Sequence, residues 1–168
     1  SDVELVAACD TDITRAQAVA PAAYSDARTM LESEQLDFLD IATQPDSHLS
    51  LLRLAINHRI PVVIQKPLAT TWSDALEAVR IVRDSGIRVM VHENWRWQPW
   101  YREAKRIISE GGIGRPIMYY FRVRQADGKG SAPYPNQPYF CRMPRFIVWE
   151  VLIHHIDTAR FLFGDIES

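Results

Sequence analysis

The sequence has 168 residues and only two cysteines, Cys9 and Cys141, which are too few for a disulfide framework and lack the spacing of a metal site. It contains no apolar run near the roughly 18 residues that cross a bilayer, and no stretch with the pattern of a signal peptide. With 19 basic and 21 acidic residues the net charge is -2, so no basic excess points to nucleic acid. We therefore expect a soluble, cytoplasmic protein that binds neither a membrane nor nucleic acid.

The seven glycines do not form the G-x-G-x-x-G turn with which a strand and a helix bind the pyrophosphate of a dinucleotide. The densest group, Gly111 to Gly114, follows an expected helix, so we interpret it as the end of that helix and a turn. In a dinucleotide-binding unit the missing turn precedes the second strand, and we expect the sequence to begin too late to contain it.

From residue 3 to residue 92, apolar runs alternate with segments of helical periodicity, and the connections between them are short. This order favours an α/β fold with a parallel sheet and right-handed crossovers. The expected strands span residues 4–9, 38–43, 62–65 and 87–91. The expected helices span residues 14–20, 25–33, 47–57 and 73–84.

One expected strand ends in a lysine. The β-branched run Val62 to Ile64 breaks at Gln65, Lys66 and Pro67, which predicts a buried parallel strand that delivers Lys66 at its carboxyl end. Pro67 has no N–H to donate, so the strand must stop there. Because ligands bind at the carboxyl ends of strands in open α/β sheets, Lys66 is a candidate site residue. The alternative is a surface lysine at a strand end.

Two other expected strands also end in polar residues. Asp10 follows the first apolar run, where a dinucleotide-binding unit carries an acid that accepts hydrogen bonds from the ribose hydroxyls. The alternative is that Asp10 or Asp12 caps the following helix. The strand over residues 38–43 is stopped by Pro45, and Asp46 or Ser47 can cap the next helix.

The composition changes after residue 92, where four large aromatic residues surround Asn94 and Arg96. Such interleaving could stack single-stranded nucleic acid, but the neighbouring charge is mixed, and a domain junction packed by large rings is the favoured interpretation. We expect an amphipathic helix over residues 99–110, a strand over 116–124 and a long loop over 125–144.

The last segment, residues 145–163, carries an acid and a histidine at helical spacing. On a helix Glu150 and His154 are four residues apart and Asp157 is three further, so all three share a face while His155 turns away by about 100°. A carboxylate one turn before an imidazole can fix its tautomer and raise its basicity, which suits proton transfer. Metal ligation and a merely ion-paired helix face remain as alternatives.

Together these motifs form an ordered pattern. This order of motifs resembles the Gfo/Idh/MocA family of sugar and inositol dehydrogenases. The matching positions, in order along the chain, are Asp10, Ala42-Thr43-Gln44-Pro45 with His48, Gln65-Lys66-Pro67-Leu68, Asn94-Trp95-Arg96, Gly111 to Gly114, Glu150 with His154 and Asp157, and Gly164. The resemblance implies a Rossmann-like parallel sheet that lacks its first strand and glycine-rich loop, over residues 1–93. It also implies the start of an α+β C-terminal substrate and oligomerisation domain, over residues 94–168.

By this resemblance the protein is an NAD(P)-dependent oxidoreductase that transfers a hydride between a nicotinamide and a sugar or polyol, and it forms a homo-oligomer. By the resemblance, Lys66 contacts both cofactor and substrate. His154 transfers the proton of the substrate hydroxyl as general acid or base, and Glu150 is the carboxylate beside it. Asp10 favours NAD over NADP, because a carboxylate repels a 2′-phosphate. The other implied cofactor-binding residues are Thr43, Pro45, His48 and Gln65. The other implied substrate-binding residues are Asn94, Arg96 and Asp157.

Some features depart from the family pattern. Gln65 replaces the usual glutamate before Lys66, and Glu150 replaces the usual aspartate. The strand near residues 20–24 is expected to be vestigial or absent, and the chain resembles a piece cut at both ends, which we expect to bind NAD poorly and to be weakly active. The alternative function is a non-catalytic nucleotide- or sugar-sensing module, which has no need for the proton path that Lys66, Glu150 and His154 provide. A glycoside-cleaving reaction with a transient redox step is a third possibility.

Overall fold

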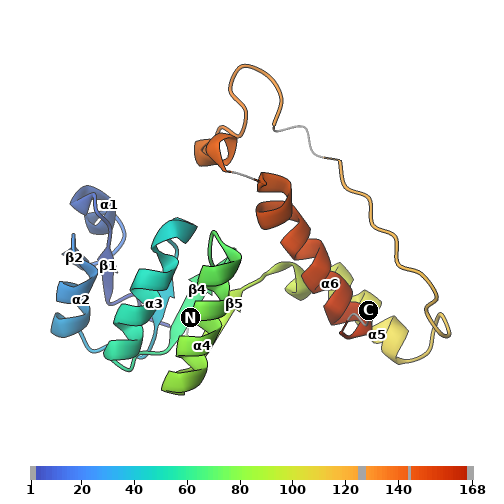
Figure 1. Cartoon of the computed structure of the whole chain (residues 1–168), viewed down its shortest axis with the longest axis horizontal. Helices are drawn as coiled ribbons and strands as arrows, with labels where there is room; N and C mark the ends of the chain where they lie inside the picture. The colour runs from blue at the N-terminus through green and yellow to red at the C-terminus, as the bar shows by residue number, and fades with distance from the viewer. Residues whose placement is uncertain (1–2, 125–127, 144, 166–168) are drawn as a thin grey trace. The chain divides into compact units, whose positions relative to one another are not determined.

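The computed structural model describes residues 3–124, 128–143 and 145–165. The chain forms two compact units, Ser1–His92 and Glu93–Ser168 (Figure 1). The strands of unit 1 are β1 (Ala7–Cys9), β2 (Ala22–Tyr24), β3 (Leu39–Ile41), β4 (Val62–Gln65) and β5 (Val89–His92). Its α-helices are α1 (Ile13–Gln17), α2 (Ala27–Ser33), α3 (His48–Asn57) and α4 (Trp72–Ser85). Unit 2 contains α5 (Pro99–Ser109) and α6 (Ile153–Phe163).

The strands of unit 1 pair in parallel, as the alternation of strands and helices predicted, but they form two sheets where one was expected. One sheet pairs β1 with β2, and the other has the order β3-β4-β5. In the second sheet Leu39 is in register with Val62, and Val62 with Val89. The short strand that was expected to be vestigial or absent is present as β2, whose three residues pair with β1.

Local signals explain where the helices of unit 1 begin and end. Asp12 caps α1 by accepting a hydrogen bond from the backbone N–H of Thr14, and Asp26 caps α2 in the same way. Thr71 caps α4, which ends at Gly86 in the left-handed conformation with φ 68°. Asp12 is therefore the capping residue of α1. Ser47 makes no capping hydrogen bond to α3, so that part of the prediction is wrong.

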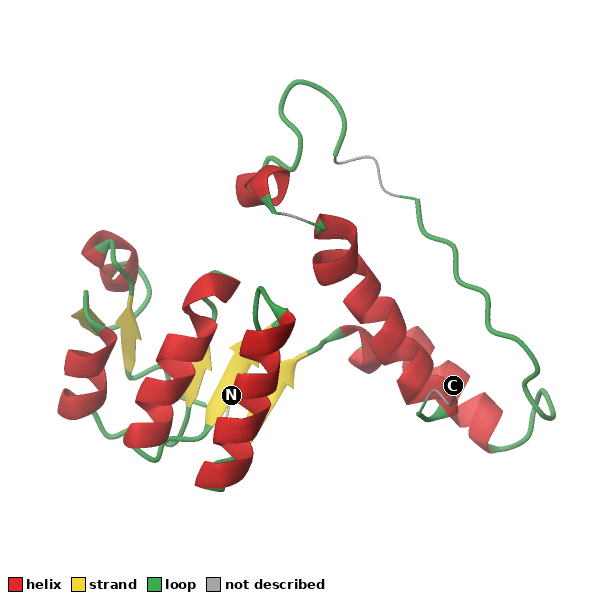
Figure 2. Ribbon diagram, viewed as in Figure 1, coloured by secondary structure: helices red, strands yellow, loops and turns green. Residues whose placement is uncertain are grey.

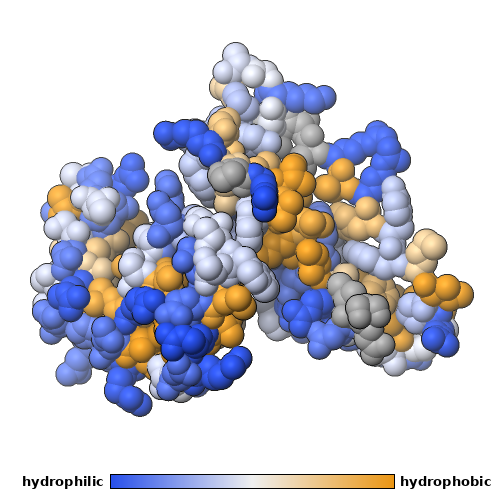
Figure 3. All heavy atoms as spheres, in the orientation of Figure 1, coloured by the Kyte–Doolittle hydropathy of each residue, from blue (hydrophilic) through white to orange (hydrophobic). Residues whose placement is uncertain are grey.

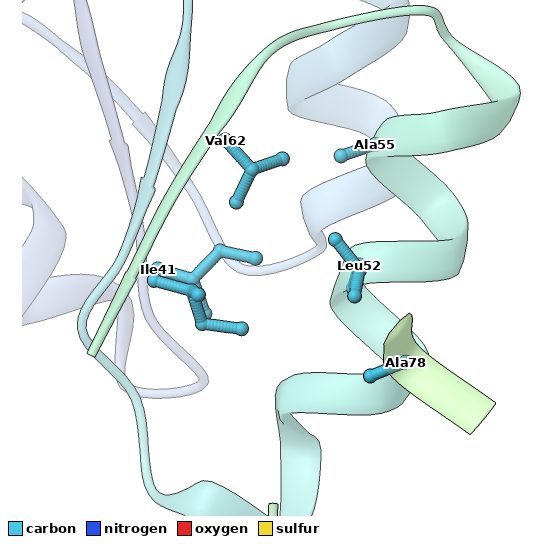
Figure 4. Packing of buried hydrophobic residues seen from close by; sticks show 6 residues of the cluster. Ile41, Leu52, Ala55, Val62 and Ala78 are labelled. Atoms are coloured by element: carbon cyan, nitrogen blue, oxygen red, sulfur yellow. The ribbon is translucent and has the colours of Figure 1, made fainter. Parts of the chain in front are cut away.

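The core of unit 1 lies between the larger sheet and two helices. Ile41 and Val62 point from β3 and β4 toward Leu52 and Ala55 of α3, with Ala78 of α4 beside them (Figure 4). A second buried cluster, formed by Met30, Leu31 and Ile60, contacts side chains of β1 and β2 as well as of β3. The two sheets thus share hydrophobic packing, although they are not hydrogen-bonded into one sheet.

Unit 2 is built on two helices that pack on each other and on a short 3₁₀ turn, Trp95–Trp97. Most of the chain between α5 and α6 runs as loop (Figure 2). The strand expected over residues 116–124 is not found among the described residues, and Ile117 and Met118 there are 96% and 85% exposed. An extended segment becomes a strand only when another strand satisfies its backbone groups, and no described segment pairs with this one. Residues 125–127 and 144 of the expected loop lie outside the described residues.

The surface of unit 1 includes hydrophobic side chains (Figure 3), among them Leu76 and Val79 on α4. None of the described helices combines the length and the apolar character that crossing a membrane requires.

Candidate functional site

The carboxyl ends of the parallel strands in unit 1 carry most of the predicted cofactor-binding residues. Asp10 directly follows β1, Lys66 directly follows β4, and Gln65 and His92 are the last residues of β4 and β5. Thr43 lies two residues beyond the end of β3. Because the strands within each sheet are parallel, the carboxyl ends of β3, β4 and β5 lie at one edge of the larger sheet and that of β1 at the corresponding edge of the smaller one. Ligands bind at such edges in α/β folds.

The carboxylate of Asp10 is held by its own loop. Its Oδ1 accepts a hydrogen bond from the backbone N–H of Asp12 at 2.8 Å and one from the hydroxyl of Thr11 at 3.5 Å. Asp12, not Asp10, caps α1, so Asp10 has no capping role. A carboxylate fixed in this way at a strand end can accept a hydroxyl hydrogen bond from a ligand through its second oxygen.

His48 joins two of the loops at this edge. Its ring is fully buried, with Nδ1 3.1 Å from the carbonyl oxygen of Pro67 and Nε2 3.1 Å from that of Thr43. Both ring nitrogens thus face protein backbone, and the expected place of His48 along the cofactor stays a prediction. The hydroxyl of Thr43 pairs with that of Ser47 at 2.7 Å, in the same turn as Pro45.

The neighbours of Lys66 connect β4 to β5. The side-chain amide of Gln65 donates to Nδ1 of His92 at 2.9 Å, and these residues are paired in the sheet register. Lys66 is half-buried and precedes Pro67 through a cis peptide bond. The side chain of Gln65 is thus hydrogen-bonded to the neighbouring strand. Where the family usually has a glutamate, this chain has a neutral hydrogen-bonding group beside the lysine.

In unit 2 the imidazole of His154 is held by a carboxylate and an indole. Nδ1 of His154 lies 2.7 Å and 2.9 Å from the two carboxylate oxygens of Glu93. The side chains of both residues are 10% exposed. The ring of Trp95 stacks flat on the imidazole, with centroids 4.6 Å apart and planes 5° from parallel. This arrangement fixes both the tautomer and the plane of His154.

Glu150 was expected to be the carboxylate that fixes the tautomer of His154, but the carboxylate at Nδ1 is that of Glu93. Glu150 is buried in a π-helical segment, Ile147–Leu152, which precedes α6. A π-helix bonds i to i+5, so the regular α-helical spacing on which the prediction relied does not apply through this segment. The charge of Glu150 adds to burial in raising the pKa of Tyr139.

Arg96 and Asp157, both predicted to bind substrate, bind each other. Nε of Arg96 donates to Oδ2 of Asp157 at 2.7 Å, and Nη2 donates to Oδ1. This paired hydrogen bonding raises the pKa of Arg96. The guanidinium also lies 5.6 Å from the ring centroid of Phe161. The pair therefore ties the 3₁₀ turn to α6, and Asn94 begins that turn by accepting a hydrogen bond from Trp97 through its backbone carbonyl.

His155 occupies an aromatic environment. Its ring centroid is 4.1 Å from that of Phe121 and 4.9 Å from that of Trp95, and neither ring nitrogen has a hydrogen-bond partner among the described residues. Burial, followed by the neighbouring His154, lowers the pKa of His155. It is therefore a neutral packing group near neutral pH.

Sequence reasoning missed Glu93 and His92. Both contacts span long stretches of sequence, 61 residues for Glu93 with His154 and 27 for His92 with Gln65. The available signal was their position, since two titratable residues directly follow the expected strand over residues 87–91. Among the described residues, no group of three or more His, Cys, Asp or Glu side chains is placed to hold a metal ion.

Two family models match the sequence. The Gfo/Idh/MocA model, described as an oxidoreductase family with an NAD-binding Rossmann fold, matches residues 1–93. The model of the Gfo/Idh/MocA C-terminal domain matches residues 101–168.

Similar proteins include sugar and inositol dehydrogenases. The D-apiose dehydrogenase of Paraburkholderia graminis is 43% identical over 97% of this chain and 44% of its own length. Inositol 2-dehydrogenase 4 of Saccharopolyspora erythraea is 32% identical over 98% of this chain and 48% of its own length. The crystal structure of an oxidoreductase from Agrobacterium radiobacter, in complex with NAD+, L-tartaric acid and magnesium, superposes with a TM-score of 0.82 at 35% identity, over 96% of this chain and 47% of that one. The chain thus spans a little under half the length of these relatives.

Proposed function

Because this chain belongs to the Gfo/Idh/MocA family of oxidoreductases, we propose that it carries the cofactor-binding and proton-transfer residues of an NAD-dependent dehydrogenase acting on a sugar or polyol. The observation that carries the proposal is the buried imidazole of His154, whose Nδ1 is held by a carboxylate. A module that only binds a nucleotide or a sugar has no use for such a group.

Unit 1 fits the adenosine and nicotinamide ends of a dinucleotide. Asp10 follows β1, its Oδ1 accepts a hydrogen bond from the backbone N–H of Asp12, and in this proposal its Oδ2 accepts a hydrogen bond from a ribose hydroxyl. A carboxylate there favours NAD over NADP, because it repels a 2′-phosphate. A nicotinamide bound at this edge would supply the acceptor for the hydride of the carbinol carbon. Thr43 and Pro45 follow β3, and Nε2 of His48 contacts this segment at the backbone carbonyl oxygen of Thr43.

Lys66 supplies the positive charge in this proposal. It follows β4 at the carboxyl edge of the sheet, next to a neutral Gln65 that is hydrogen-bonded to His92. An ammonium group at this position favours the negative charge that develops on a hydroxyl oxygen as its proton departs.

His154 supplies the proton acceptor. Its Nδ1 donates to Glu93, so in the neutral ring Nε2 carries a lone pair that can take the proton of a substrate hydroxyl. In the reverse direction the same atom returns the proton to the carbonyl oxygen. Asn94, Arg96 and Asp157 bind the substrate in this proposal, with Arg96 and Asp157 acting as a bonded pair, and Glu150 is a second carboxylate, one helical turn before His154.

The test uses a protein of the relatives' full length that carries this sequence. NADH is titrated by energy transfer from the five tryptophans, and NAD-dependent turnover is measured on apiose, myo-inositol and related polyols. We expect His154→Ala to abolish turnover and to leave NADH binding nearly intact. The matched control, His58→Ala, changes a half-buried histidine at the end of α3 and should leave both intact.

Two results would overturn the proposal. If neither the full-length protein nor the 168-residue chain binds NADH, the dehydrogenase function fails. If NADH binds and His154→Ala turns over at the original rate, His154 is not the proton acceptor. Binding by the longer protein alone is the result we expect, since the G-x-G-x-x-G turn is not part of this sequence.

A further inference from the structure

We infer that Glu93 is the positioning residue that holds the proton on Nδ1 of His154 and so leaves Nε2 as the proton acceptor. The inference rests on the proposed function and assigns to Glu93 the task that sequence reasoning gave to Glu150. It comes from contacts within unit 2 alone.

The first argument is the direction of the hydrogen bond. Both oxygens of the Glu93 carboxylate lie within 3 Å of Nδ1, at 2.7 Å and 2.9 Å. An ionised carboxylate only accepts hydrogen bonds, so Nδ1 must carry the hydrogen. A neutral imidazole has one N–H, and with Nδ1 protonated the lone pair is on Nε2.

The second argument is that Glu93 is itself fixed. Its Oε1 accepts a hydrogen bond from the backbone N–H of Trp95 at 3.1 Å, two residues further along the chain. The same Trp95 stacks on the face of the imidazole. Glu93 and Trp95, two residues apart, therefore hold His154 by one ring nitrogen and by one ring face, which leaves the ring little freedom to flip or tilt.

The third argument is electrostatic. When Nε2 takes the hydroxyl proton, the ring becomes an imidazolium with protons on both nitrogens, and the adjacent carboxylate stabilises that charge. The other carboxylate bonded to this turn, Asp157, is engaged by Arg96 through two hydrogen bonds. Glu93 is thus the acid whose charge is directed at His154.

The tautomer can be measured without activity. In the 168-residue chain labelled with ¹⁵N-histidine, we expect His154 to show a protonated Nδ1 and an unprotonated Nε2 at a pH where the ring is neutral. Glu93→Gln preserves the size of the side chain but can both accept and donate, so the two tautomers should become mixed. Glu103→Gln, which removes an exposed acid on α5, should leave the His154 spectrum unchanged.

Turnover is measured in the protein of the relatives' length. We expect Glu93→Gln to lower kcat by about 10- to 100-fold with little change in KM, because it alters proton transfer rather than binding. Glu93→Asp retains the charge and should recover part of that loss. Circular dichroism of each variant checks that the total helix content is retained.

The outcomes separate the two proposals. An unchanged His154 tautomer in Glu93→Gln, or a kcat within twofold of the original, would overturn the role of Glu93. The dehydrogenase function would survive that result if His154→Ala still abolishes turnover. Conversely, if the protein shows no NAD-dependent turnover, the proposed function is wrong. The ¹⁵N spectra would still decide whether Glu93 sets the tautomer of His154.

Discussion

Replacing His48 by phenylalanine is the sharpest test of how the cofactor edge of unit 1 is held together. Phenylalanine fills the volume of the buried ring but cannot donate to the carbonyl oxygens of Thr43 and Pro67, each 3.1 Å from a ring nitrogen. These two carbonyls belong to the loops after β3 and β4. The variant therefore removes the connection between the loops that carry Thr43 and Lys66 while keeping the packing.

The expected cost follows from the burial of the two carbonyls. A neutral imidazole has one N–H, so it donates to one of them at a time. Losing that bond costs about 1 to 3 kcal/mol for the buried carbonyl of Pro67 and about 0.5 to 1.5 kcal/mol for the part-buried carbonyl of Thr43. We therefore expect His48→Phe to lower the free energy of unfolding of unit 1 by about 1 to 3 kcal/mol.

The assay is urea unfolding followed by circular dichroism, with His58→Phe as the matched control. His58 lies at the opposite end of α3 and is half-buried, so its replacement should change the free energy of unfolding by less than about 0.5 kcal/mol. Equal losses in the two variants would refute the argument, because packing on α3 and not hydrogen bonding to these carbonyls would then explain the cost.

Three further predictions concern other described contacts. A double-mutant cycle of Arg96→Gln and Asp157→Asn should give a coupling energy of about 1 kcal/mol or more, and an additive result would contradict the bidentate pair. Burial raises the pKa of Cys9, so a thiol reagent should modify the exposed Cys141 first, and faster labelling of Cys9 would contradict its placement. Burial lowers the pKa of His155, so the unfolded chain takes up the proton more readily. The free energy of unfolding should then fall as the pH drops below about 6.5, a dependence that His155→Phe should weaken.

The parallel sheets and the position of Lys66 could be predicted because their signals are local. A β-branched run that breaks at a proline gives both the strand and its end, and β4 ends at Gln65 as that pattern indicates. The capping residues Asp12 and Asp26 and the left-handed Gly86 are equally local. Such features depend on residues no more than a few positions apart.

The parts that could not be predicted depend on contacts between distant residues. The segment 116–124 has the alternation of a strand, but a strand exists only when a partner pairs with it. Glu93 and His154 are 61 residues apart in the sequence, and no periodicity in either segment indicates that they are in contact. Glu150 was chosen because it is four residues from His154, and the π-helical segment alters that spacing.

Because Trp95 stacks on His154, the fluorescence of Trp95 should report the protonation of this histidine. A protonated imidazole quenches the emission of an indole that it touches, and these two rings lie 4.6 Å apart and nearly parallel. In a variant that keeps Trp95 and replaces the other four tryptophans by phenylalanine, the emission should therefore dim as His154 gains a proton. The protein thus contains its own fluorescent indicator for the proton that its proposed chemistry moves.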